Sequence, residues 1–115
     1  MAEMLWSDPQ MVPGRGPSKR GVGSSFGPDV TARFLADNNL ELVIRSHEVK
    51  DKGYLYEHDG KLITVFSAPN YCDQVGNMGA YVVLKKDLKP QCVSFTHVPH
   101  PTVPPMAYAS SMWGF

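Results

Sequence analysis

The 115-residue sequence has little of several features that would point to particular classes of protein. It contains only two cysteines, Cys72 and Cys92, which lack the Cys-x-x-Cys spacing of a zinc site and are too few for a disulfide framework. Its 11 basic and 11 acidic residues cancel, so no cationic surface is expected for nucleic acid or for an anionic membrane. Two free thiols, no nucleic-acid partner and no membrane partner are therefore expected.

Long apolar runs are absent too. The longest, residues 62–66 and 81–84, fall far short of the roughly 20 residues that a membrane-spanning helix needs. The N-terminus lacks the basic start, apolar stretch and small-residue cleavage site of a secretory signal, which favours an intracellular protein. With 43% hydrophobic and 19% charged residues, the composition is that of a globular protein with at most one domain.

Proline, glycine and serine are concentrated in residues 9–28, which predicts a long loop without regular structure. Such loops are usually functional or disordered, and this one carries Arg20. A helix is predicted next, over residues 28–38, because proline is favoured at the first helical position and Asp29 suits the positive end of a helix. Its apolar stripe is predicted from Val30, Phe34 and Leu35.

About five strands are predicted after the helix. Their ranges are 40–45, 53–58, 61–66, 79–85 and 91–97, and Asp59-Gly60 is predicted as a two-residue hairpin turn between the second and third. One main helix with these strands indicates a mixed α/β fold. The loops after the strands carry His47 and Asn70-Tyr71-Cys72, and rigid strands can hold such side chains over one shared site.

Four loop motifs carry a resemblance to a known family. They are Trp6-Ser7-Asp8-Pro9, Lys19-Arg20-Gly21-Val22, Arg45-Ser46-His47-Glu48 and Ser67-Ala68-Pro69-Asn70-Tyr71-Cys72. In this order and with these separations, they closely resemble the C-terminal half of the catalytic domain of the metal-dependent serine/threonine phosphoprotein phosphatases. The resemblance implies part of the calcineurin-like metallophosphatase β-sandwich, with residues 1–109 as the C-terminal portion of the domain and 110–115 as a divergent, disordered tail.

The resemblance also assigns roles to four side chains. His47 would be a metal ligand in a centre of two divalent ions (Mn, Fe, Zn or Mg) that activates water for attack on phosphorus. Arg20, Tyr71 and Asp8 would be catalytic: Arg20 and Tyr71 would bind the substrate phosphate, and Asp8 would order the arginine or a metal-bound water. From the residues alone, a surface histidine, a solvated loop cation and a packing ring are the alternative interpretations of His47, Arg20 and Tyr71.

Three motifs of the family are missing from this sequence, namely Gly-Asp-x-His-Gly, Gly-Asp-x-x-Asp-Arg-Gly and Gly-Asn-His-Glu. They supply most of the metal ligands, so His47 alone would leave two dications without charge compensation or fixed geometry. We therefore expect a fragment that is inactive alone. Two hypotheses stay open: a part of a phosphatase whose activity belongs to the complete catalytic domain, or an inactive truncated module that binds other proteins.

The resemblance further implies phosphoserine and phosphothreonine proteins as substrates, and a cytoplasmic and nuclear location. The family member with the most similar motifs binds the chaperone Hsp90 through a tetratricopeptide domain. That domain is absent from these residues, so Hsp90 is expected only as a partner of a longer protein. The remaining histidines, His58, His97 and His100, are expected to be exposed or packing residues rather than ligands.

Overall fold

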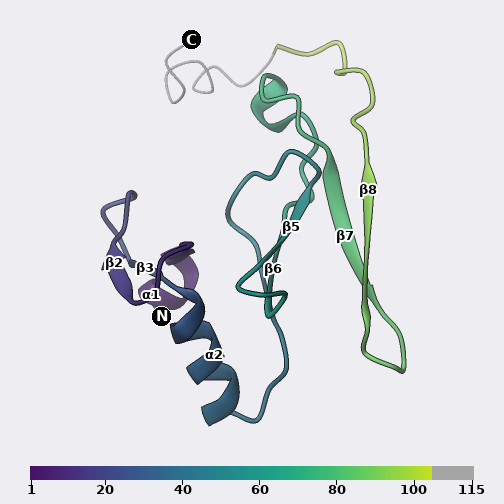
Figure 1. Cartoon of the computed structure of the whole chain (residues 1–115). Helices are drawn as coiled ribbons and strands as arrows, with labels where there is room; N and C mark the ends of the chain where they lie inside the picture. Colours follow the sequence, from purple (N-terminus) through teal and green to yellow (C-terminus); the bar gives the residue numbers. More distant parts are fainter. Residues whose placement is uncertain (105–115) are drawn as a thin grey trace.

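The computed structural model describes residues 1–104, which form three small sheets with two α-helices and one short 3-10 helix. The elements in chain order are α1 (Ala2–Trp6), β1 (Asp8–Pro9), β2 (Arg15–Pro17), β3 (Ser24–Phe26), α2 (Pro28–Asp37), β4 (Val43–Arg45), β5 (Tyr54–Glu57), β6 (Leu62–Val65), η1 (Tyr71–Asp73), β7 (Gly79–Leu84) and β8 (Pro90–Phe95). Figure 1 shows α2 and the first sheet, formed by β1, β2 and β3, on one side, the β7–β8 ribbon on the other, and β5 and β6 between them. The radius of gyration is 16.1 Å, against about 13 Å for a compact domain of this length, so the arrangement is extended.

The first sheet lies where the sequence predicts a loop without regular structure, so that prediction is wrong. β3 pairs in parallel with β1 and antiparallel with β2, and the turns between them fall at glycines. Gly14, Gly21 and Gly23 all have positive φ angles, which cost glycine little. Strands of two or three residues are too short to produce an alternating pattern, which explains why the sequence does not reveal them.

The helix predicted over residues 28–38 is confirmed as α2, which ends one residue earlier, at Asp37. Its buried face differs from the predicted stripe, because Thr31 and Leu35 are buried whereas Phe34 is 51% exposed. The reason is a polar contact: the Thr31 hydroxyl lies 2.8 Å from Nδ1 of His58, which is also buried. This pairing turns the Thr31 side of the helix inward. The expectation that His58 is a packing residue is therefore confirmed.

In the central sheet, β6 lies between β4, to which it is parallel, and β5, to which it is antiparallel. Leu62, Ile63 and Thr64 of β6 have no exposed surface, so this strand forms the centre of the small core. β4 begins only at Val43, because the Leu40 amide instead donates to Leu35 and closes the end of α2. The predicted strand is therefore right in place but too long.

The predicted hairpin between β5 and β6 is confirmed, but its turn is not the two-residue Asp59-Gly60. Glu57 pairs with Leu62, so residues 58–61 form the connection. His58, Asp59 and Gly60 all have left-handed φ angles, and the Gly60 amide donates to the Glu57 carbonyl. The buried hydrogen bond of His58 favours this longer turn over the shorter one.

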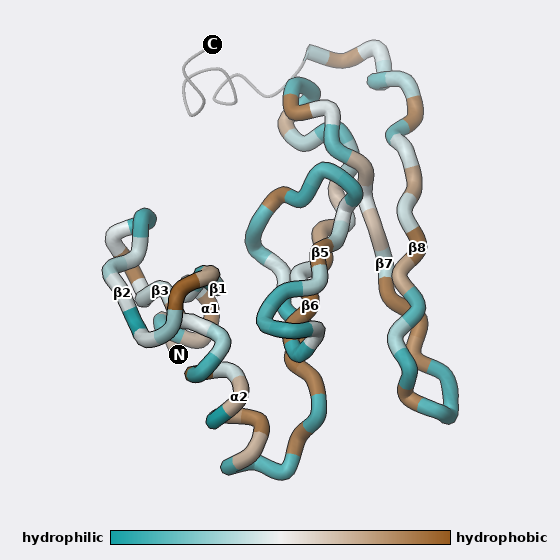
Figure 2. Tube along the Cα trace, in the orientation of Figure 1, coloured by the Kyte–Doolittle hydropathy of each residue, from teal (hydrophilic) through white to brown (hydrophobic). Residues whose placement is uncertain are grey.

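The last two predicted strands are confirmed as the antiparallel β7–β8 ribbon, although β8 ends at Phe95 rather than residue 97. One face packs toward β5, where the Cys92 thiol lies 3.7 Å from the Tyr56 hydroxyl, and the Ser94 hydroxyl donates to the Lys52 carbonyl just before β5 over 2.6 Å. On the other face Tyr81, Val93 and Phe95 are each more than a third exposed. Figure 2 shows apolar stretches along both strands of the ribbon.

The predicted α/β composition is thus observed, with three short strands added in the region expected to be a loop. Both cysteines are free thiols, as predicted. No helix within residues 1–104 is long and apolar enough to cross a membrane. The tail predicted for residues 110–115 lies outside the described residues.

Candidate functional site

His47 lies just after β4, as the sequence predicts, with its side chain at the surface. Its φ angle is 93°, a value that residues with a side chain rarely adopt. Arg20 Nη2 donates to the His47 carbonyl over 2.9 Å, and the ring of Trp6 meets the imidazole edge to face at 5.1 Å between centroids. Because a strained backbone persists only where its surroundings fix it, Arg20 and Trp6 define the position of this loop.

Arg20 lies on the glycine-rich loop between β2 and β3 and forms an ion pair with Asp8 of β1. Its Nε donates to Asp8 Oδ2 over 2.6 Å, and its Nη2 approaches Asp8 Oδ1 at 3.4 Å. The Asp8 side chain is only 7% exposed, whereas Arg20 remains about a quarter exposed. Asp8 therefore lies behind the arginine and orients it from below the surface.

The charges of this pair shift both ionisation equilibria. Burial is the largest single influence on Asp8 and opposes its ionisation, but the hydrogen bonds and positive charges of Arg20 and Arg45 together outweigh it, so the pKa of Asp8 lies below its usual value. The hydrogen bond to Asp8 raises the pKa of Arg20 above its usual range. Both groups are therefore charged at neutral pH, and the pair persists as an ion pair.

A second arginine, Arg45 at the end of β4, also binds Asp8, with 2.9 Å between Nη2 and Oδ1. Its Nη1 donates to Glu48 Oε2 over 2.6 Å and approaches Thr64 Oγ1 at 3.3 Å. Thr64 in turn donates to Glu57. We call these five residues the Asp8 network; its members are Asp8, Arg45, Glu48, Glu57 and Thr64. The sequence prediction assigned no role to Arg45, Glu48, Glu57 or Thr64, although Arg45 and Glu48 flank His47 in its motif.

Tyr71 begins η1, in a loop whose backbone is held by a buried amide. Asn77 accepts a hydrogen bond from the Tyr71 amide over 2.8 Å, and its Nδ2 donates to the carbonyls of Ala68 and Met78. The ring of Tyr71 also packs edge to face on Phe66, with 5.0 Å between centroids. The sequence gives no role to Asn77. A polar residue between Gly76 and Met78 in a turn-rich stretch gives no sign of being buried.

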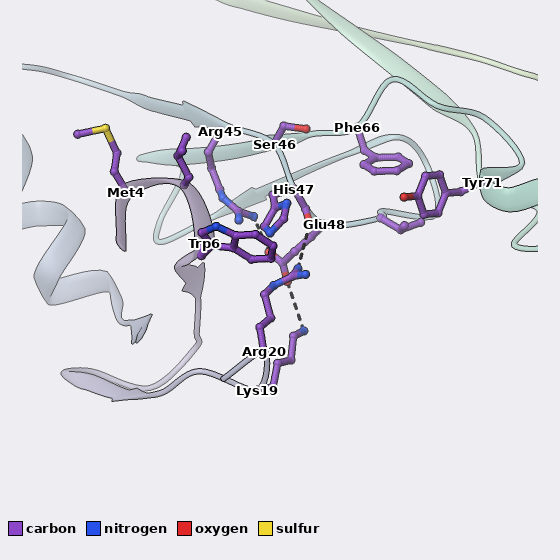
Figure 3. A pocket seen from close by; sticks show the side chains of 12 residues that line it. Met4, Trp6, Lys19, Arg20, Arg45, Ser46, His47, Glu48, Phe66 and Tyr71 are labelled. Carbon is purple, nitrogen blue, oxygen red and sulfur yellow. Dashed lines mark hydrogen bonds and ion pairs between the residues drawn. The ribbon is translucent and has the colours of Figure 1, made fainter. Parts of the chain in front are cut away.

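Arg20, His47 and Tyr71 line the same open cavity, which has a volume of about 1130 Å³. In Figure 3, the hydroxyl of Tyr71 is directed toward the side of the cavity where His47 and Arg20 lie. Asp8 is not among the lining residues, because it lies beneath Arg20. The structure thus brings three of the four predicted site residues to one cavity and places the fourth in contact with one of them. Their catalytic roles stay predictions.

The donor atoms of this region do not fit a complete metal centre. Within residues 1–104, no group of three or more His, Cys, Asp or Glu side chains is arranged to hold a metal ion. Two carboxylates of the Asp8 network, those of Asp8 and Glu48, form ion pairs with arginines. His100 pairs instead with Asp73, at 3.0 Å, on a different surface. His47 is therefore the candidate ligand that the described residues supply, and any further ligands would come from other residues.

Comparison with known proteins shows similarity to one family. Residues 2–51 match the calcineurin-like phosphoesterase family. The chain is 70% identical over 112 residues to serine/threonine-protein phosphatase 5 of Arabidopsis thaliana, a match that covers 96% of this chain and 21% of that protein. It is 62% identical to serine/threonine-protein phosphatase T of Schizosaccharomyces pombe (97% and 24%) and 59% identical to human serine/threonine-protein phosphatase 5 (97% and 23%).

A solved structure gives the same result for the fold. It is that of a protein serine/threonine phosphatase from Saccharomyces cerevisiae with similarity to human phosphatase PP5, and it superposes with a TM-score of 0.83 at 45% identity, covering 92% of this chain and 36% of that one. The chain spans about a fifth to a quarter of the length of the curated relatives. The family resemblance and the metallophosphatase fold are thereby confirmed: over nearly its whole length the chain is similar to one part of the serine/threonine protein phosphatases, and residues 2–51 match the calcineurin-like phosphoesterase family.

Proposed function

We propose that this chain forms the phosphate-binding part of a protein serine/threonine phosphatase, and that hydrolysis of phosphoserine and phosphothreonine belongs to the complete catalytic domain. The observation that supports this most directly is the position of Arg20. A buried carboxylate fixes its guanidinium at the edge of a cavity that His47 and Tyr71 also line. A planar, permanently charged group held in this way suits contact with phosphoryl oxygens.

The contacts of Arg20 leave donors for such a ligand. Among residues 1–104, its hydrogen bonds are made by Nε and Nη2, to Asp8 and to the His47 carbonyl. The hydrogen atoms of Nη1 are then available for a phosphate oxygen. Tyr71, whose hydroxyl is directed toward the same part of the cavity, would supply a further donor.

Metallophosphatases act with divalent metal ions, and we propose that His47 is one ligand of such a centre in the complete domain. Its neutral imidazole suits Mn, Fe, Zn or Mg to different degrees, and the remaining ligands would come from the part of the relatives beyond the match. We further propose a cytoplasmic and nuclear location. Hsp90 would bind only to a longer protein that carries a tetratricopeptide domain.

The test uses a full-length phosphatase in which this chain replaces the 112 matching residues of the Arabidopsis relative. We expect turnover of p-nitrophenyl phosphate with added manganese, and a loss of about 100-fold in kcat/KM for Arg20→Ala. The matched control is Arg33→Ala, an exposed arginine of α2 whose one ion pair within residues 1–104 is with Asp37. A folded chimaera without turnover, or an Arg20→Ala variant as active as the control, would contradict the proposal.

The exposed apolar face of the β7–β8 ribbon favours a second candidate, an inactive module that binds other proteins. Tyr81, Val93 and Phe95 form a surface that an isolated chain would tend to cover with another chain. The expected result is retention of full-length phosphatase by the immobilised chain at micromolar concentration. If Val93→Lys binds as well as the original chain, this face is not the contact surface.

A further inference from the structure

We infer that Arg45 is a positioning residue for Arg20, acting through the Asp8 carboxylate that the two arginines share. The inference rests on the proposed function, in which Arg20 binds the substrate phosphate. Arg45 does not itself need to touch the phosphate. Its part is to fix the direction and the net charge of the group that does.

The loop that carries Arg20 provides little restraint of its own. Gly21 follows Arg20 directly and Gly23 lies two residues further on, and both have φ angles of 74°. Glycine has more backbone freedom than any other residue, so the position of the guanidinium must be imposed by contacts from outside the loop. Two contacts do this, one with the Asp8 carboxylate at 2.6 Å and one with the His47 carbonyl at 2.9 Å.

Asp8 is in turn oriented by Arg45. Each carboxylate oxygen has its own close partner: Oδ2 accepts from Nε of Arg20, and Oδ1 accepts from Nη2 of Arg45 at 2.9 Å. The longer distance of 3.4 Å from Arg20 Nη2 to Oδ1 shows that Arg45 occupies the second oxygen more closely. Without Arg45, the carboxylate could turn to bind Arg20 with both oxygens, and the guanidinium would rotate with it.

Arg45 is itself anchored in the central sheet. Its side chain is 13% exposed, and its Nη1 binds Glu48 on the His47 loop and Thr64, a fully buried residue of β6. A second donor group, Nη2, also reaches the Ser7 carbonyl at 3.2 Å. The direction of the Arg20 side chain is thus linked to the buried strand residue Thr64 by successive contacts through Arg45 and Asp8.

The shared carboxylate also affects the charge that a phosphate would meet. One negative charge on Asp8 faces two guanidinium groups, so Arg20 is only partly neutralised by it. If Arg45 were removed, Asp8 would be left to pair with Arg20 alone. The attraction of Arg20 for an anionic ligand would then fall, even if the loop kept its shape.

The test separates positioning from a merely structural role by a double-mutant cycle in the full-length chimaera described above. Arg45→Ala is expected to weaken competitive inhibition by inorganic phosphate about tenfold, with a smaller change in kcat. In the Arg20→Ala background the same substitution should weaken phosphate inhibition no further, because Arg45 acts through Arg20. Arg33→Ala is the control in both backgrounds.

The inference would be overturned if Arg45→Ala weakened phosphate inhibition by the same factor with and without Arg20, or if it did not weaken phosphate inhibition at all. Loss of phosphate binding on Arg20→Ala but not on Arg45→Ala would leave the proposed function standing and reject the positioning role. No effect of Arg20→Ala would reject both. If Arg45→Ala fails to fold by circular dichroism, Arg45→Lys decides the question, since a single ammonium keeps the charge but cannot bridge Asp8 and Glu48 as the guanidinium does.

Discussion

The two sides of the central sheet are built in different ways. On the side of the first sheet, contacts run through the Asp8 network, a set of buried charged and polar groups with bond lengths between 2.6 and 3.3 Å. On the other side, the β7–β8 ribbon is held by its backbone ladder and leaves an apolar face exposed. The candidate site belongs to the first region. Charged contacts impose direction on side chains, which apolar packing does not, and a phosphate site depends on direction.

Removal of the Asp8 carboxylate, which Arg20 and Arg45 share, should destabilise the network side of the molecule most strongly. We expect Asp8→Ala to lower the free energy of unfolding by about 3 kcal/mol, because the largely buried Arg45 and the partly exposed Arg20 lose their common partner. Denaturant unfolding of the full-length chimaera measures the change. Asp37→Ala, which removes an exposed carboxylate of α2, should leave the unfolding midpoint in place. Equal midpoints for both variants would mean that the network does not stabilise this region.

The loop of Tyr71 should depend on a single neutral side chain. Asn77→Ala removes one acceptor and two donors that bind backbone groups, and we expect a loss of about 2 kcal/mol in local stability. Hydrogen exchange at the Tyr71 amide should accelerate more than at β6. Gln74→Ala, an exposed change in the same loop, is the control. An unchanged exchange rate at Tyr71 would show that the loop is held by other contacts.

Acid should weaken the network region before the ribbon. The pKa of Asp8 is lower in the folded protein than its ordinary value of 3.8, so its stabilising contribution is complete above that value and is lost as the pH falls through the folded pKa. Stability should therefore decline below about pH 4, and less steeply in Asp8→Asn. The comparison uses the unfolding midpoints of the original protein and of Asp8→Asn, measured between about pH 2 and about pH 7. Parallel curves for the two proteins would contradict this assignment.

The exposed face of the ribbon should respond least in stability. Val93→Thr is nearly isosteric and lies on the open side of β8, so we expect a change within about 0.5 kcal/mol. Self-association, measured by sedimentation velocity, should nevertheless decrease because the substitution interrupts an apolar patch. A large loss of stability would show that this face is packed rather than open.

The sequence predicts well what depends on local pattern. Pro28 and Asp29 mark the start of α2 correctly, and the predicted strand ranges 79–85 and 91–97 place the β7–β8 ribbon within two residues. It fails where distant polar contacts decide. The inward face of α2 is chosen by the contact between Thr31 and His58, and the longer turn before β6 accompanies it.

The site shows the same division. Arg20, His47 and Tyr71 were found through the family motifs, and their meeting at one cavity agrees with the expectation of a shared site. Arg45 and Asn77 could not be assigned, because a charged residue at a strand end and an amide in a turn are ordinary surface residues by composition. Only the pairing of β4 with β6 and the fold of the Tyr71 loop bury them.

The measurement that tests the central claim most directly is the equilibrium affinity of the full-length chimaera for inorganic phosphate, determined by calorimetry with and without Arg20. The account predicts that Arg20→Ala weakens the affinity about tenfold or more, as expected for the loss of a charged hydrogen bond, while Arg33→Ala leaves it unchanged. Equal phosphate affinity in the Arg20→Ala variant and the original chimaera would contradict the claim that this cavity binds phosphate through Arg20.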